Sequence, residues 1–192
     1  MKMTKIILIR PGATDYDKQE RIQGDLDVPL NPQGNGEVAK LVEELSKMPI
    51  EAVYAPPCEP AQQTARAIAE ALDVKCRKLD RMKNLNHGLW QGMRVDEVRL
   101  KYPRAYRQWQ DQPECVQPPA GETLDQASRR IDSTLAKLLK KHKEGMIALV
   151  LPEPMASLAR HHFNQEEIGD LWKASQGHGN WEMCEVRPSV VA

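Results

Sequence analysis

The sequence lacks any long hydrophobic run. No stretch approaches the roughly 20 consecutive apolar residues that a membrane-spanning helix requires. The apolar run after Lys5 is too short for the core of a signal peptide, and no small-residue cleavage site follows it. We therefore expect a cytoplasmic protein that has no membrane segment.

The chain also lacks a charge imbalance. Its 27 basic residues are matched by 27 acidic residues, so the formal net charge is zero. A neutral chain has no overall field that would attract nucleic acid or an anionic membrane surface. We predict neither as a partner, although a local basic pocket remains compatible with this balance.

Paired cysteine motifs are absent as well. The four cysteines are scattered along the chain, and none belongs to a Cys-x-x-Cys pair. Scattered cysteines are typical of reduced thiols, in contrast to a disulfide framework or a zinc site. The histidines and cysteines show no metal-ligand spacing. We therefore predict no metal and no cofactor.

The 192 residues predict one domain, residues 1–192, that is long enough to bury a core. Helical spacing and caps predict helices from Pro32 onward and at about 61–72, 122–143, 155–162 and 165–174, with a further helical stretch from 95 to 109 that Pro103 interrupts. Short apolar runs predict strands at about 6–9, 52–55, 74–78, 146–151 and 181–186, and residues 15–30 read as a polar loop. Alternating strands and helices predict an α/β fold, a three-layer α/β/α sandwich with a mostly parallel central sheet.

Two of the apolar strands end abruptly at proline. Residues 6–9 lead into Arg10, Pro11 and Gly12, and residues 146–151 lead into Pro152. Ligands of open α/β sheets bind at the carboxyl ends of the strands. We therefore expect these two loops to lie side by side and to mark the functional site.

Four short segments resemble those of the histidine phosphatase superfamily, in its phosphoglycerate-mutase-like branch. Residues 10–14 read Arg-Pro-Gly-Ala-Thr where family members have Arg-His-Gly-Glu-Thr. Residues 21–30 match the family form Arg-x-Gln-Gly-x-x-Asp-x-Pro-Leu at every specified position, and residues 88–92 and 121–123 resemble its Gly-x-Trp-Glu-Gly and Gly-Glu-Ser stretches. The resemblance extends over essentially the whole chain and implies a phosphoglycerate-mutase-like fold.

The resemblance also implies a chemistry, and this chain departs from it. In the family a histidine attacks phosphorus, two arginines and a second histidine hold the phosphoryl oxygens, and a glutamate protonates the leaving oxygen. The nucleophile position is occupied here by Pro11 and the second arginine position by Pro60. The acid position is occupied by Asn84 and the second histidine position by Pro152. We predict no catalytic residue of the family type.

A remnant of an anion or substrate pocket is still implied by the positions that keep polar groups. These are Arg10, Thr14, Asp17, Arg21, Gln23 and His178. Two interpretations of Arg10 stay open: it binds an anion, or it pairs with Asp15, Asp17 or Glu153 and closes the pocket.

Four histidines and one cysteine are candidates to replace the lost catalytic groups. His178 precedes the last strand at the ligand edge and is the best candidate. For His87 a loop position without function is favoured, and for His161 and His162 a solvated or helix-capping role is favoured. Cys58 lies in a loop near the expected pocket beside Glu59, which disfavours a thiolate. The four tryptophans are assigned to packing.

Three functional hypotheses follow. The first is a pseudophosphatase with a binding or regulatory role, which takes a small anionic or phosphorylated ligand or a protein partner. The second is a phosphatase or mutase-like enzyme that acts on a phosphorylated small molecule by an altered mechanism, or another hydrolase that uses His178 or Cys58. The third is a non-catalytic subunit in a complex with an active relative.

Overall fold

The computed structural model describes residues 3–186 of the chain; residues 1–2 and 187–192, the ends of the predicted domain range, lie outside the described part. A five-stranded sheet occupies the centre, with the strand order β3-β2-β4-β1-β5. The strands are β1 (Thr4–Ile9), β2 (Ile50–Ala55), β3 (Lys75–Lys78), β4 (Gly145–Val150) and β5 (Trp181–Val186). β5 pairs antiparallel with β1, and the other pairings are parallel. The predicted mostly parallel sheet is confirmed.

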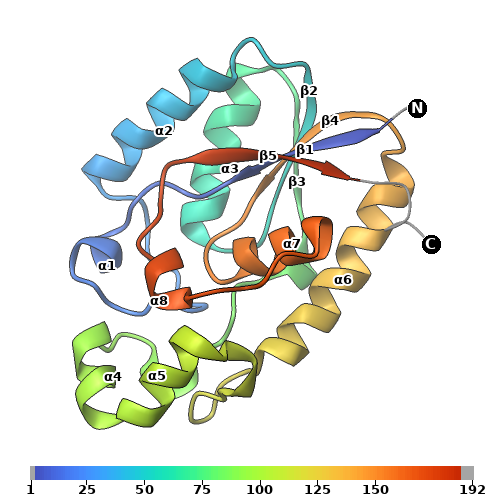
Figure 1. Cartoon of the computed structure of the whole chain (residues 1–192). Helices are drawn as coiled ribbons and strands as arrows, with labels where there is room; N and C mark the ends of the chain where they lie inside the picture. Colours follow the sequence, from blue (N-terminus) through green and yellow to red (C-terminus); the bar gives the residue numbers. More distant parts are fainter. Residues whose placement is uncertain (1–2, 187–192) are drawn as a thin grey trace.

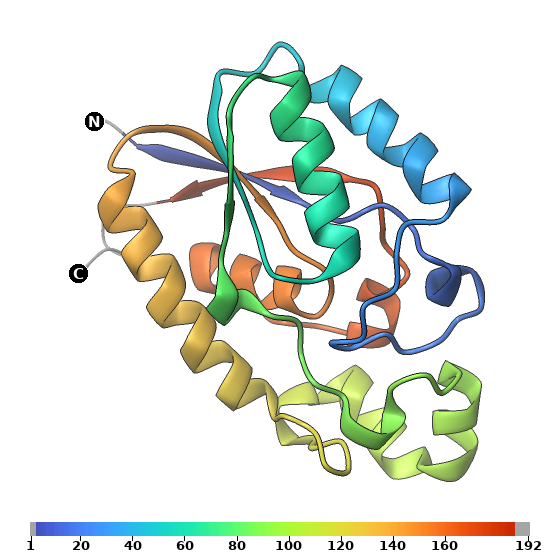
Figure 2. The same ribbon diagram turned by 180° about the vertical axis from the view of Figure 1, so that it is seen from behind.

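Helices cover both faces of this sheet, as Figures 1 and 2 show from opposite sides. One layer contains α2 (Pro32–Leu45) and α3 (Glu59–Ala71), and the other contains α6 (Leu124–Lys141) and α7 (Met155–Asn164). The three-layer α/β/α prediction is therefore confirmed. The shorter helices α1 (Asp15–Lys18), α4 (Val95–Lys101), α5 (Pro103–Asp111) and α8 (Leu171–Ala174) gather near one end of the sheet, and the 3-10 turns η1 (Asp80–Met82), η2 (Gly88–Trp90) and η3 (Pro113–Cys115) lie in the connections.

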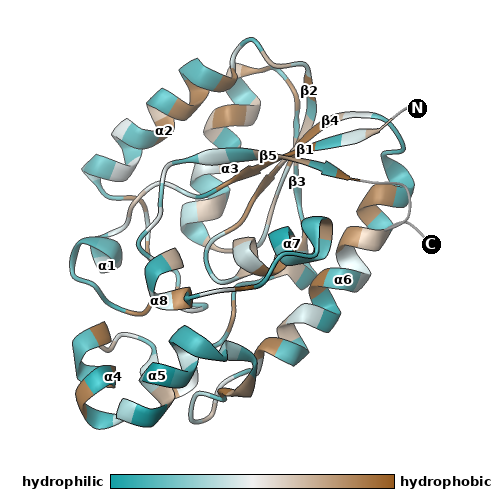
Figure 3. Cartoon of the chain, viewed as in Figure 1, coloured by the Kyte–Doolittle hydropathy of each residue, from teal (hydrophilic) through white to brown (hydrophobic). Residues whose placement is uncertain are grey.

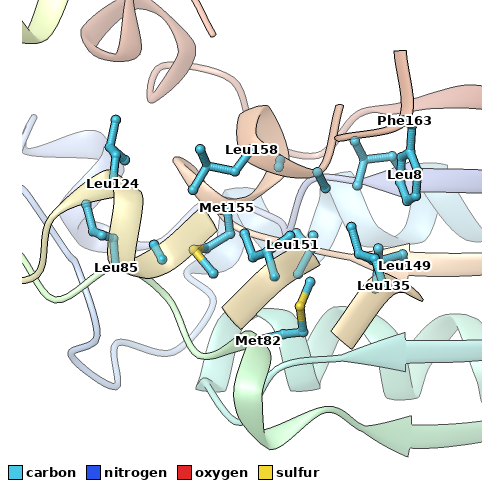
Figure 4. Packing of buried hydrophobic residues seen from close by; sticks show 14 of the residues in the cluster. Leu8, Met82, Leu85, Leu124, Leu135, Leu149, Leu151, Met155, Leu158 and Phe163 are labelled. Carbon is cyan, nitrogen blue, oxygen red and sulfur yellow. The ribbon is translucent and has the colours of Figure 1, made fainter. Parts of the chain in front are cut away.

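Both faces of β1 are buried, which explains its uninterrupted apolar sequence. Ile7 and Ile9 belong to the hydrophobic cluster under α2 and α3. Ile6 and Leu8 belong to the opposite cluster, which includes residues of α6 and α7. Figure 3 shows the central strands coloured as hydrophobic, and Figure 4 shows the packing of the second cluster around Leu149, Leu151 and Met155.

Strand register fixes where the loops meet. β1 and β4 run parallel with Ile9 opposite Val150, and the amide of Leu151 donates to the carbonyl of Ile9 over 2.9 Å. The antiparallel strand β5 begins at the same edge, with Trp181 opposite Ile9, and the Arg10 amide donates to the Asn180 carbonyl over 2.8 Å. Three loops therefore meet at the carboxyl edge, as predicted for two of them.

Two predicted segments were wrong. The region 15–30 was expected to be a loop, but it begins with α1, because Thr14 and Asp17 form a reciprocal capping box. The region 165–174 was expected to be one helix, but helical structure occurs only at Leu171–Ala174. α7 ends where Gln165 adopts a left-handed conformation, and Asp170 caps the new helix through the amides of Trp172 and Lys173.

Within residues 3–186, no helix has both the length and the apolar content that crossing a bilayer would require.

We predict opposite effects from alanine at two glycines of α2. A Cβ at Gly34 would lie 2.7 Å from the Ala13 nitrogen and still nearer its carbonyl oxygen, whereas a Cβ at Gly36 would meet nothing within 4 Å. Gly34→Ala should therefore lower the free energy of unfolding by about 2 kcal/mol or more through backbone displacement. Gly36→Ala should raise it by up to about 1 kcal/mol through helix propensity. Urea unfolding followed by circular dichroism measures both, and equal effects would contradict the close approach of α2 to residue 13.

Candidate functional site

A cavity of about 990 Å³ opens at the carboxyl edge of the sheet. The loops after β1 and β4, the loop before β5 and the helices α4, α5 and α8 contribute its walls. The four positions that the resemblance assigns to chemistry all line it: Pro11, Pro60, Asn84 and Pro152. The chain therefore brings together residues that are far apart in sequence, at the place predicted for the site.

The three prolines give the cavity wall apolar rings where the family resemblance places donors. A proline ring has no N–H group, and its side chain neither donates nor accepts a hydrogen bond. Pro60 lies in the first turn of α3, where a missing N–H costs nothing. The Pro11 carbonyl accepts from the Gly179 amide over 2.8 Å, which ties the first loop to the loop before β5. These residues shape the wall and do not offer groups to a phosphate.

Asn84 is committed to the backbone around it. Its side-chain Nδ2 donates to the Gly24 carbonyl over 2.8 Å, and its Oδ1 accepts from the Leu85 amide over 2.9 Å. The residue is only 5% exposed. An amide in this state holds two loops together and has no acidic proton to give.

Arg10 forms an ion pair with Glu153, and both side chains are largely enclosed, with exposed fractions of 12% and 5%. Nη1 of Arg10 also donates to the Ala174 carbonyl over 2.8 Å. A Cβ at Gly177 would lie 2.6 Å from that nitrogen, so a larger residue there would displace the guanidinium. Glu153 is additionally held by the Ser157 amide in the first turn of α7, over 3.2 Å. Of the partners considered for Arg10, the structure selects Glu153, and Arg10 does not reach the cavity wall within the described part of the chain.

The other residues predicted for the pocket line the cavity: Thr14, Asp17, Arg21, Gln23 and His178. Asp17 is occupied by the capping box, because its Oδ2 accepts from the Thr14 amide over 2.6 Å and from the Thr14 hydroxyl over 2.9 Å. Arg21 donates from Nη1 to the Gly92 carbonyl over 2.6 Å. Much of the polar capacity on this wall is therefore used internally.

His178 forms a pair with Glu37, a residue that the sequence did not single out. The Nδ1 atom of His178 lies 2.9 Å from the carboxylate, which also accepts from the Ala13 amide and from Gln33, each over 2.9 Å. Burial opposes the charge of Glu37, but the hydrogen bonds from Gln33, Ala13 and His178 outweigh it and lower the carboxyl pKa. Glu37 directly precedes the buried position Val38 on α2, and no periodic signal marks it in the sequence.

Three further replacement candidates, Cys58, His161 and His162, do not line the cavity. Cys58 is the buried N-cap residue of α3 and does not line the cavity that the described residues form. Burial raises the pKa of its thiol to about 12, so the sulfur stays protonated and is a poor nucleophile. His161 contacts the Glu166 carbonyl, and His162 pairs with Asp132 over 2.7 Å between Nδ1 and Oδ1, both away from the cavity wall.

His87 and three tryptophans form an aromatic cluster beneath one side of the cavity. Trp90 contacts Trp109 and Trp172 with ring-centroid separations of 6.4 and 6.2 Å, and Trp109 lies edge-on to His87 at 5.4 Å. These tryptophans are almost fully buried, so packing is their main role, as expected. Burial lowers the pKa of His87 to about 4, and the imidazole is therefore neutral at pH 7.

A metal centre has no obvious ligand set here. Within residues 3–186, no group of three or more histidine, cysteine, aspartate or glutamate side chains is placed to hold an ion.

The chain matches the family model of the histidine phosphatase superfamily (branch 1) over residues 6–189. It is also 34% identical over 148 residues to phosphoserine phosphatase 1 of Hydrogenobacter thermophilus, which covers 77% of this chain and 70% of the relative. The chain therefore belongs to the histidine phosphatase superfamily, as the four sequence segments suggested.

Solved structures agree with this fold. A protein titled mycobacterial hydrolase 1 superimposes with a TM-score of 0.86 at 21% identity, covering 96% of this chain and 91% of the other. A mutant phosphoserine phosphatase from Entamoeba histolytica, in complex with phosphoserine, superimposes with a TM-score of 0.80 at 23% identity, covering 96% and 94%. At these identities the likeness establishes the fold alone.

We predict that His87 makes folding stability fall with acidity. Burial lowers the pKa of folded His87 to about 4, below the usual histidine pKa of 6.5, so the unfolded chain binds a proton at a pH where the folded chain does not. This contribution to stability is present above about pH 6.5 and is lost as the pH falls toward 4; it amounts to about 3 kcal/mol. Urea unfolding across this range should show a smaller loss in His87→Phe than in the wild type. Parallel pH curves for the two proteins would contradict a buried neutral imidazole.

Proposed function

We propose that this protein is a pseudophosphatase, a member of the superfamily that keeps the fold and does not transfer phosphoryl groups through a phosphohistidine. Its cavity then serves to bind a small ligand. The observation that carries the proposal is the enclosed pair of Arg10 with Glu153. The arginine that the family resemblance assigns to phosphate is neutralised by a carboxylate of the same chain.

Energetic considerations support this proposal. Each missing charged donor removes a hydrogen bond of roughly 1.5–3 kcal/mol to the phosphoryl oxygens. A phosphate entering beside Arg10 would also have to displace Glu153, and leaving a buried charge without its partner costs about 3–5 kcal/mol. The covalent route additionally requires a nucleophile, which the ring of Pro11 does not provide. The replaced family positions therefore affect phosphate binding and nucleophilic attack, and Asn84 at the acid position also removes proton donation.

The proposed ligand is a small anionic or phosphorylated molecule, bound on the outer wall of the cavity. The volume of about 990 Å³ suits a small molecule. Arg21, Arg99 and Lys173 line this cavity and are at least partly exposed, so they can contact an anionic group that Arg10 cannot. The relatives named as phosphoserine phosphatases support this class of ligand.

We predict that the pure protein does not hydrolyse p-nitrophenyl phosphate above the buffer rate. The reason is that position 11 carries no nucleophile and that no free donors surround the phosphate position. Release of p-nitrophenolate, measured by absorbance, tests this directly. Turnover that disappears in Arg10→Ala would show that Arg10 acts on phosphate and would overturn the proposal.

We further predict that Pro11→His alone forms no phosphohistidine during incubation with a phosphodonor such as acetyl phosphate. The new imidazole would face a wall in which Pro60, Pro152 and Glu153 still offer no donor. The matched comparison is the fourfold variant Pro11→His, Pro60→Arg, Pro152→His and Glu153→Gly, in which the donor set is restored. Acid-labile phosphate detected on the single variant by mass spectrometry would mean that the phosphate-binding wall is better preserved than proposed.

A further inference from the structure

The imidazole of His178 has a defined tautomer. A carboxylate without a proton can only accept a hydrogen bond, so the Nδ1 atom facing Glu37 carries the hydrogen. The lone pair is then on Nε2, which makes no hydrogen bond within residues 3–186. The side chain is 27% exposed and lies on the cavity wall. His178 thus combines a fixed orientation with an available nitrogen.

The loop that carries His178 is held firmly against α2. The Gly179 amide donates to the Pro11 carbonyl over 2.8 Å. Gly179 has a positive φ of 59°, and a Cβ there would lie 2.6 Å from the Cβ of Glu37. Only glycine allows this approach without strain. Glu37 is itself held by hydrogen bonds from the Ala13 backbone amide and from the Gln33 side chain. The backbone therefore helps to fix the position of the carboxylate that faces His178.

The other paired histidines in the described residues lack this combination. His162 also has a carboxylate partner, Asp132, but its Nε2 atom is enclosed without a partner. His142 uses Nε2 to contact the Tyr54 hydroxyl over 2.7 Å. His161 contacts a neutral backbone carbonyl through Nδ1 and has no carboxylate partner to orient it.

We propose that His178 is a nucleophilic acyl acceptor for small uncharged activated esters that enter the cavity, with Glu37 as its positioning residue. Histidine is an established covalent nucleophile when a neighbouring group orients it. An uncharged ester suits this position, because it carries no charge for the Glu37 carboxylate beside His178 to repel and needs no charged donor to bind. The proposal goes beyond the pseudophosphatase function, since attack at a carbonyl carbon needs none of the lost phosphate donors.

The reaction balances with water as the co-reactant. The Nε2 lone pair forms a bond to the carbonyl carbon, and the bond from that carbon to the ester oxygen breaks, so the alkoxide leaves with the electron pair. The Nδ1 proton passes to Glu37, which leaves a neutral acyl-imidazole. Water then adds to the acyl carbon, the C–N bond breaks, and one hydrogen of the water returns to the imidazole. The proton on Glu37 is released and neutralises the alkoxide, so one ester and one water give one acid and one alcohol.

The test uses the full chain and p-nitrophenyl acetate. The wild type should release p-nitrophenolate at least about tenfold faster than His178→Gln, a smaller effect than the roughly 10²–10⁴-fold that a positioned acid or base contributes in an enzyme. His161→Gln and His162→Gln are the matched controls and should keep the wild-type rate, which separates His178 from general surface reactivity. Equal rates for the wild type and His178→Gln would overturn the proposal.

The role of Glu37 has its own spectroscopic signature. In ¹⁵N spectra of histidine-labelled wild type, His178 should show a protonated Nδ1 and an unprotonated Nε2, and Glu37→Gln should shift it toward the opposite tautomer. Slower ester cleavage in Glu37→Gln should accompany that shift. An unprotonated Nδ1 in the wild type would overturn the assignment.

A second measurement applies if His178→Gln fails to fold. Diethyl pyrocarbonate, itself an uncharged acyl donor, should modify His178 of the wild type before His161 and should leave His162 untouched, as read by peptide mapping. An unmodified His178 would overturn the proposal.

The phosphatase assay is independent of these results. Turnover of p-nitrophenyl phosphate contradicts the pseudophosphatase function, whereas a wild type that does not cleave p-nitrophenyl acetate contradicts only the acyl-acceptor role.

Discussion

The enclosed contact between Arg10 and Glu153 depends on the parallel pairing of β1 with β4. Because Ile9 lies opposite Val150, the two loops that follow these strands emerge side by side. An arginine on one loop then finds a carboxylate on the other, and the first turn of α7 holds that carboxylate from behind. Separation from water makes this interaction costly to break. The pair therefore joins β1, β4, α7 and the loop before β5 at one point.

Around this point, two of the four positions that the resemblance assigns to chemistry have a structural use: Pro60 fits the first turn of α3, and Asn84 connects two loops. The backbone carbonyl of Pro11 also receives the Gly179 amide. In the proposed function, the wall has been rebuilt from groups that stabilise the loops, in place of groups that bind phosphate. His178 lies on the same wall, and its imidazole is held by Glu37. The proposed loss of phosphoryl transfer is therefore compatible with an oriented imidazole at His178.

Much of the fold could be predicted from the sequence, because buried strands such as residues 6–9 and the capped start of α2 leave strong local signals. The carboxyl-edge site followed from two apolar strands that end at proline, and the positions of Pro11, Pro60, Asn84 and Pro152 followed from the resemblance. The helix expected at 165–174 was wrong, because Gly169 adopts a positive φ of 75° and Asp170 caps a helix that begins only at Leu171. The pairings Arg10–Glu153 and His178–Glu37 depend on tertiary contacts between distant segments, for which a single sequence carries no marker.

A crystal structure grown in the presence of orthovanadate is the most direct test of the central claim that Glu153 occupies the anion position beside Arg10. We predict that the Glu153 carboxylate remains against the Arg10 guanidinium and that no vanadate lies between them. A vanadate within hydrogen-bonding distance of Arg10, with Glu153 displaced into the cavity, would contradict the claim and would favour an active phosphate site.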